Sequence, residues 1–266
     1  MPTVSLTSAL REQYATLFDT CAADPARQPD VEKCAKGVEF GRPQYEAVGS
    51  PLGIPWYVIG AIHSMETGLS FQRHLHNGDP LTARTVHFPP GRPASGSPPY
   101  SWVDSANDAL LLRRMDKWTD WTIPGLLYQL EAYNGFGYRT QHPDVLTPYL
   151  WSFSNHYRSG KYVADGTWSQ TAKSAQCGAA VILRRLAEKG VIQFSREGVP
   201  VAKSPGDLAP LVQFSLTKES DAAAKLQEAL NNFPGVFVKA DGVPGKATSD
   251  ACKRVLGHFL TGDPRA

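Results

Sequence analysis

A glutamate at the end of an apolar stretch is the residue best placed to do chemistry. The sequence predicts a helix over 55–67, because Pro55 suits a first turn and Gly68 suits the left-handed position just beyond a helix end. Glu66 then lies in the last turn, where the helix dipole disfavours a negative charge. The dipole and partial burial both raise the pKa of a carboxyl, as a general acid at neutral pH requires. On position alone, an exposed glutamate at a frayed helix end is the simpler interpretation.

A second motif follows in EAYNGFGYR, where Ala-Tyr-Asn ends a helix predicted over 124–133. A glutamate that closes a buried helix and is followed by Thr67 and then Phe71 resembles the lysozyme superfamily. Within it, goose-type lysozymes and soluble lytic transglycosylases share the motif Ala-Tyr-Asn-Ala-Gly, in which this chain has Gly-Phe-Gly after the Asn. The resemblance covers residues 50–165. It implies a lysozyme-like α+β catalytic domain that cleaves the bond between N-acetylmuramic acid and N-acetylglucosamine of peptidoglycan, with Glu66 as general acid.

Tyr133 and Asn134 of this motif are candidate substrate-binding residues. Asparagine offers a donor and an acceptor to an N-acetyl group, and tyrosine offers a flat face to a sugar ring. The alternative is a helix C-terminus that ends at an asparagine. Further aromatics gather in PYLWSFSNHYRSGKYV, and we expect half of them in the core. Tyr162, in GKYV, resembles the Tyr-Val of transglycosylases and is a further candidate for the cleft.

Glycoside hydrolysis normally needs a second carboxylate, about 5–5.5 Å from the first in retaining enzymes and about 6.5–9.5 Å in inverting ones. Asp79, in HNGDP, is the first candidate downstream, and we expect it to activate water or to stabilise an oxocarbenium ion. Thr85 is placed to position that water. Alternatively, Asp79 only caps the Asn77-Gly78 turn. Glu66 alone would then support a lytic transglycosylase, with the substrate's own hydroxyl as nucleophile.

Histidines around Asp79 support a rival hypothesis. His74, His76 and Asp79 could bind zinc in a peptidoglycan amidase or peptidase, with His63 and His87 nearby. Their spacing matches no zinc signature, and H-E-x-x-H is absent. We therefore expect no metal and no cofactor. A third hypothesis is a non-catalytic cell-wall-binding protein.

The C-terminal residues resemble the three-helix peptidoglycan-binding domain. The pattern is Leu-Gln, then Leu, then an Asp-Gly-x-x-Gly-x-x-Thr loop before a final helix. These positions are Leu226, Gln227, Leu230, Asp241, Gly242, Gly245 and Thr248. Turn and cap chemistry explains most of them, so we expect them to be structural, with Ser220 or Asp221 capping one helix and Thr248 or Ser249 the next. The alternative is a generic helical hairpin.

The whole pattern predicts a mainly α fold with a small hairpin or loop region. We expect a catalytic domain over 1–190, a linker over 191–218 with one short hairpin, and a wall-binding domain over 219–266. A long segment over 68–100, rich in Gly, Pro, Asn and Ser, carries function or hides a short hairpin. In the catalytic domain, helices are expected at 6–20, 55–67, 102–115, 124–133 and 167–189.

Composition and charge limit the kinds of partner that the sequence predicts. Lys+Arg 27 against Asp+Glu 25 gives a net charge of +2, which does not indicate a nucleic-acid partner, and no apolar run is long enough to cross a bilayer. We expect a monomer whose partner is bacterial peptidoglycan. The N-terminus lacks the features of a signal peptide. This predicts a phage endolysin made in the cytoplasm that reaches the wall in the periplasm after holin-type release, or by an unknown export route.

Four cysteines are too few and too scattered for a disulfide scaffold. Cys21 and Cys34 could pair around a short N-terminal loop. Cys177 and Cys252 lie in apolar stretches and are expected to be buried.

Overall fold

The computed structural model describes residues 4–164, 166–194, 205–231, 233, 236 and 238–266. The chain divides into two compact units, Met1–Ser195 and Arg196–Ala266. Each unit has its own apolar core. No helix among the described residues is long and apolar enough to cross a membrane.

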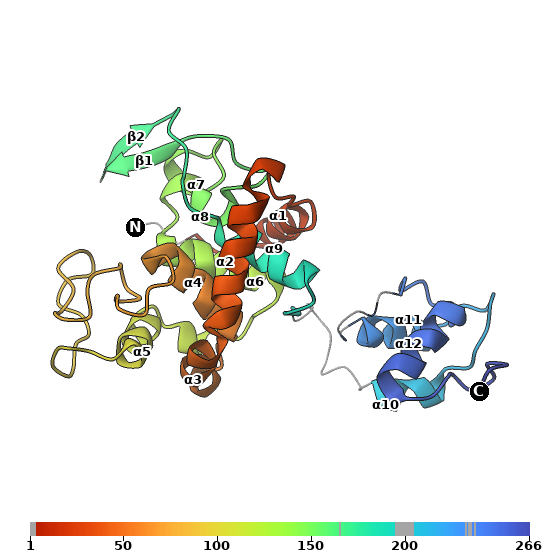
Figure 1. Ribbon diagram of the computed structural model, residues 1–266. Helices are drawn as coiled ribbons and strands as arrows, with labels where there is room; N and C mark the ends of the chain where they lie inside the picture. The colour runs from red at the N-terminus through yellow and green to blue at the C-terminus, as the bar shows by residue number, and fades with distance from the viewer. Residues whose placement is uncertain (1–3, 165, 195–204, 232, 234–235, 237) are drawn as a thin grey trace. The chain divides into compact units, whose positions relative to one another are not determined.

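The first unit is mainly helical, as the sequence predicts (Figure 1). Its sheet has two antiparallel strands, with Tyr162 opposite Trp168. Short 3₁₀ turns lie at Pro25–Arg27 and Met115–Lys117. The helices are α1 (Ser8–Asp19), α2 (Gln28–Phe40), α3 (Arg42–Leu52), α4 (Trp56–Thr67), α5 (Trp102–Leu112), α6 (Ile123–Asn134), α7 (Gly137–Gln141), α8 (Pro148–Trp151) and α9 (Ala179–Glu188), and the strands are β1 (Lys161–Ala164) and β2 (Thr167–Ser169).

Helix α4 lies in the core of this unit. Its residues from Tyr57 to Met65 are all buried, and α2, α3, α6 and α9 pack around it (Figure 1). The close approach needs Gly60, since a Cβ there would lie 2.5 Å from Val38 Cγ1 and 2.9 Å from Tyr45 Cε2. Gly68 ends the helix at φ +61°, in the left-handed region expected from the sequence.

Several predicted helices are confirmed and others are wrong. Helices α1, α4, α5 and α6 lie within a few residues of their predicted ranges. The prediction over 167–189 is wrong in its first half, because 167–169 is a strand and α9 begins only at Ala179, after Gly178. Helices α2 and α3 were not predicted.

The long segment over 68–100 contains no strand, so it hides no hairpin, and the two-stranded hairpin of this unit is at 161–169. One isolated bridge joins Arg73 and Pro80. Side chains order the rest: His74 Nδ1 lies 2.8 Å from Ser105 Oγ of α5, and its Nε2 lies 2.8 Å from the Ala83 carbonyl oxygen. The segment is therefore an ordered loop tied to α5.

The second unit contains α10 (Pro205–Leu208), α11 (Asp221–Leu230) and α12 (Lys246–Leu256), with a 3₁₀ turn at Ala209–Leu211. Gln227 is 1% exposed and ties the Asp-Gly loop to α11. Its side-chain nitrogen donates to Asp241 Oδ1 (3.1 Å) and its oxygen accepts from the Gly242 N–H (2.8 Å). The motif residues are therefore structural, as expected.

Two expectations for the linker and the second unit need correction, and one is confirmed. Leu208, Ala209 and Val212, expected in the linker, are buried in the second core, and 195–204 of that linker lies outside the described residues. Ser220 caps α11 as expected. Thr248 and Ser249 are not caps, because α12 begins at Lys246 and buries both.

Of the expectations for the cysteines, the burial of two is confirmed and the possible disulfide is not. Cys21 and Cys34 do not pair, and both are free thiols, Cys21 being buried. Cys177 and Cys252 are also free and buried, as their apolar surroundings predict.

A buried carboxylate links α1, α6 and α7. Glu131 of α6 is 2% exposed, accepts a hydrogen bond from Tyr14 of α1 (2.6 Å) and pairs with Arg139 of α7 (2.8 Å). Arg139→Met leaves this carboxylate buried without its cation, so we expect a loss of about 3–5 kcal/mol in the free energy of unfolding. Arg42→Met, which breaks an exposed pair with Glu46, should cost less than about 1 kcal/mol.

Urea unfolding at pH 7 followed by tryptophan fluorescence measures both variants. All six tryptophans lie in the first unit, so the signal reports on that unit alone. Equal losses in the two variants would contradict the importance of the buried pair.

Candidate active site

Glu66 lies where the sequence predicts, in the last turn of α4. Part of the residue is accessible, but its carboxyl is surrounded by protein atoms and accepts a hydrogen bond from the Tyr149 hydroxyl at 3.0 Å. Burial raises the pKa of Glu66 from 4.5 to about 7, while the Tyr149 hydrogen bond and the charge of Arg113 hold it from rising further. Glu66 thus exchanges a proton near neutral pH.

Two tyrosines and an arginine surround this carboxyl. Burial and the charge of Glu66 raise the pKa of both Tyr133 and Tyr149, which brings the two phenols and the carboxyl into one electrostatic group. The Arg113 guanidinium lies over the Tyr133 ring, 5.1 Å from its centre. Sequence reasoning did not single out Arg113 or assign Tyr149 to Glu66, since Tyr149 comes from the distant helix α8 and no local pattern links the two.

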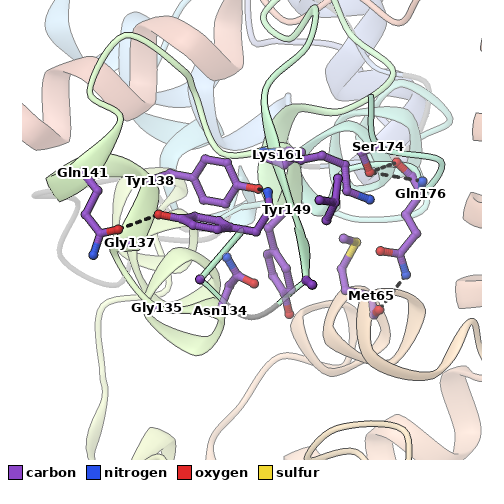
Figure 2. A pocket seen from close by; sticks show the side chains of 15 residues that line it. Met65, Asn134, Gly135, Gly137, Tyr138, Gln141, Tyr149, Lys161, Ser174 and Gln176 are labelled. Atoms are coloured by element: carbon purple, nitrogen blue, oxygen red, sulfur yellow. Dashed lines mark hydrogen bonds between the residues drawn. The ribbon is translucent and has the colours of Figure 1, made fainter. Parts of the chain in front are cut away.

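A cavity of about 670 Å³ adjoins this group (Figure 2). Met65, the neighbour of Glu66, and Tyr149 line it on one side, and Asn134 and Tyr138 line it from the end of α6 and from α7. Gln176 donates a hydrogen bond to the Met65 carbonyl (2.9 Å), as Figure 2 shows. The acid predicted from the sequence therefore lies next to a space large enough for a ligand.

Of the predicted substrate-binding residues in the helix-end motif and the hairpin, some line the cavity and one does not. Asn134 is exposed and lines the cavity, and so does Tyr162 of β1, whose hydroxyl donates to Gln141 Oε1 at 2.5 Å. Tyr133 is instead 4% exposed and donates to the Leu75 carbonyl oxygen at 2.9 Å. Its hydroxyl therefore ties α6 to the long loop, and its ring is not offered to a ligand.

Aromatic residues that sequence reasoning missed cluster beside Tyr162. The His142 and Trp168 rings stack with 3.5 Å between their centres, and Tyr138 meets Tyr162 edge to face. Tyr138, like Tyr162, lines the cavity. The hairpin and α7 thus form an aromatic wall, in which strand pairing sets Tyr162 opposite Trp168 and ring contacts add Tyr138 and His142.

Asp79 is occupied within its own loop. Its carboxylate accepts the backbone N–H groups of Val86 (2.8 Å) and His87 (3.0 Å), and one oxygen lies 2.5 Å from His87 Nδ1. Burial raises the pKa of Asp79, but these hydrogen bonds outweigh it and hold the pKa below its ordinary value. The Thr85 hydroxyl likewise donates to the Pro89 carbonyl oxygen (2.6 Å) and accepts from the Arg92 N–H (2.9 Å). Both side chains thus organise the loop, and Asp79 caps the N–H groups of Val86 and His87 rather than the Asn77-Gly78 turn.

The histidines that suggested zinc have protein partners. His63 Nδ1 lies 2.8 Å from the Tyr45 hydroxyl, and His76 Nε2 lies 2.8 Å from Asp108 Oδ2. Within the described ranges, no three His, Cys, Asp or Glu side chains are grouped to hold a metal ion.

The raised pKa of Glu66 predicts how stability depends on pH. The folded protein keeps the Glu66 proton up to about pH 7, whereas the unfolded chain releases it near 4.5, so this group lowers stability as pH rises between those values. At about 1.4 kcal/mol for each unit of pKa, Glu66→Gln should be more stable than wild type by up to about 3 kcal/mol at pH 8, and no more stable at pH 4. Urea unfolding by tryptophan fluorescence tests this, and a difference that is constant with pH would contradict it.

The Tyr149 hydrogen bond can be tested separately. Tyr149→Phe removes a donor that favours the ionised carboxylate, so we expect the pKa of Glu66 to rise above about 7. Carbon-13 NMR of the glutamate carboxyls over pH 4–9 measures it. Tyr128→Phe, which removes a hydroxyl bonded to the Val4 carbonyl oxygen, is the matched control and should leave the pKa of Glu66 unchanged.

Chemically, the arrangement can donate and regain a proton near neutral pH at the edge of a cavity with polar and aromatic walls. Asn134 and Tyr162 offer that cavity hydrogen-bonding groups. No known protein family, no curated protein and no solved structure matches this chain.

Proposed function

We propose that the protein degrades peptidoglycan by cleaving the bond between N-acetylmuramic acid and N-acetylglucosamine, with Glu66 as the general acid. The observation that carries this proposal is the pKa of Glu66, raised to about 7 beside a cavity. A glycosidic oxygen is a poor leaving group unless it is protonated as the bond breaks, and a carboxyl that is still protonated at neutral pH can do this.

The reaction uses one proton at Glu66. The Glu66 carboxyl gives its proton to the glycosidic oxygen while the bond from that oxygen to the sugar's anomeric carbon breaks. A nucleophile then bonds to the anomeric carbon and returns a proton to the Glu66 carboxylate. Water gives a reducing muramic acid end, and the sugar's own 6-hydroxyl gives an anhydro end. Since the Asp79 carboxylate is engaged by its loop, Glu66 serves both proton transfers in this scheme.

Two further features support a cell-wall polymer as substrate. The cavity offers Asn134, able to bond an N-acetyl group, and the tyrosine faces of Tyr138 and Tyr162. The Leu-Gln and Asp-Gly motif of the second unit resembles a peptidoglycan-binding domain. We therefore propose a lysozyme-like first unit joined to a wall-binding second unit, as in an endolysin that reaches the wall after release through the host membrane.

Digestion of purified peptidoglycan, followed by mass spectrometry of the fragments, tests this proposal. Wild type should release glycan fragments with muramic acid ends, reducing or anhydro. Glu66→Gln should lower the rate by at least about a hundredfold, since it removes the transferable proton. Glu12→Gln, at an exposed position of α1, is the matched control and should digest like wild type.

The fragments also separate the alternatives. Reducing ends would identify a muramidase, and anhydro ends a lytic transglycosylase. Cleaved stem peptides on intact glycan, released equally by Glu66→Gln, would overturn the proposal in favour of a peptidase or amidase. Wall binding without any fragments would instead indicate a non-catalytic protein.

A further inference from the structure

A second cavity, of about 1120 Å³, lies in the first unit next to the one beside Glu66. Ser174 lines both cavities, so the two share a wall. The second cavity is bounded by the segment that precedes α2, by the segment that follows α8, and by the stretch before α9. The glycan cleavage proposed above makes no use of it.

Positive charge gathers at this cavity. Arg27, Arg158 and Lys173 come from these separate segments, and Arg158 and Lys173 are exposed. In the part of the chain that the structure describes, neither of these two has an ion pair with a carboxylate, while Arg27 lies 3.4 Å from Asp30. Asp24 is the one acidic side chain in the lining, and it accepts the Ala26 N–H (2.9 Å) at the start of a 3₁₀ turn. The cavity therefore has a net positive charge.

Backbone hydrogen bonds connect two of the segments that line the cavity. The Asp24 N–H donates to the Phe153 carbonyl oxygen (2.9 Å), and the Asn155 N–H donates to the Ala22 carbonyl oxygen (3.0 Å). Phe153 has φ +70°, a left-handed conformation that is costly for a residue with a side chain. Its ring lies under the Arg27 guanidinium at 4.0 Å, which orients that cation at the cavity.

We propose that this cavity binds the carboxylate-bearing peptide stem of the glycan strand that occupies the first cavity. This inference rests on the proposed function, because it takes the strand beside Glu66 to be peptidoglycan. In that polymer the peptide stems carry free carboxylates and branch from the muramic acid next to the bond that is cleaved. A stem that leaves the first cavity across Ser174 meets Arg158 and Lys173, which have donors free for a carboxylate.

Binding of a free stem peptide tests the inference without any glycan chemistry. A synthetic stem tetrapeptide with free carboxylates, and the same peptide with its carboxylates amidated, are titrated into the full chain by calorimetry at low and high salt. The test variant is Arg158→Gln/Lys173→Gln. The matched control is Lys33→Gln/Lys36→Gln, which removes the same charge from exposed positions of α2 that do not line the cavity.

We expect the free carboxylate peptide to bind, more weakly as salt rises. Affinity in Arg158→Gln/Lys173→Gln should fall roughly tenfold or more, since hydrogen bonds to charged groups contribute on that order. The control variant should bind like wild type. Equal affinity for the amidated peptide, or equal loss in the two double variants, would overturn the inference. Both substituted residues are exposed, and an unchanged unfolding curve by tryptophan fluorescence shows that the fold is intact.

The outcome is separable from that of the proposed function. Peptide binding needs no proton from Glu66, so Glu66→Gln should bind the stem peptide like wild type. If digestion of peptidoglycan did not depend on Glu66 but the peptide titrations followed the expected pattern, the acid assignment would fail and the peptide site would stand. If digestion depended on Glu66 and the titrations did not follow the pattern, the reverse would hold.

Discussion

The burial of α4 on all sides is the constraint on which the first unit depends. A helix whose residues from Tyr57 to Met65 are all buried must be enclosed, and α2, α3, α6 and α9 enclose it. The same enclosure fixes where the helix ends, because Gly68 turns the chain away in the left-handed region. Met65, in the last turn of α4, therefore lines the cavity, and the adjacent Glu66 keeps its carboxyl surrounded by protein atoms. The apolar core and the raised pKa of Glu66 have one cause.

Burial by itself would raise the pKa of Glu66 above the value that suits proton transfer at neutral pH. The Tyr149 hydrogen bond and the charge of Arg113 act against burial, and the balance leaves the pKa at about 7 rather than higher. Tyr149 comes from the short helix α8, which Thr147 caps, and its hydroxyl donates to the Glu66 carboxyl at 3.0 Å. A group whose pKa lies near the pH of its surroundings is populated in both protonation states, which proton donation followed by proton return requires. The site is thus a compromise between desolvation and nearby polar groups.

Sequence reasoning placed Glu66 in the last turn of its helix because those signals are local. The apolar run before Glu66 and the glycine after it lie within one segment, and so do the Leu-Gln and Asp-Gly positions around Gln227. Helices α2 and α3 were not predicted, although Pro29 and Pro43 lie in their first turns, where proline is favoured. The aromatic wall and the hydrogen bond from Tyr149 to Glu66 could not be predicted from local patterns, since each joins segments far apart in the chain. Only tertiary packing creates such sites.

In the loop over 68–100, residues of the types used in catalysis and metal binding serve as hydrogen-bond partners of the backbone. Without strands or helices, the backbone N–H and carbonyl groups of a long segment need other partners, because an unpaired polar group inside a protein is costly. Asp79, Thr85 and His74 supply those partners with side-chain oxygen and nitrogen atoms. Carboxylates, hydroxyls and imidazoles are also the groups that catalysis and metal binding use, so composition alone does not separate the two roles. The distinction lies in whether a side chain is saturated by its own loop, as Asp79 is, or is left with a titratable proton beside a cavity, as Glu66 is.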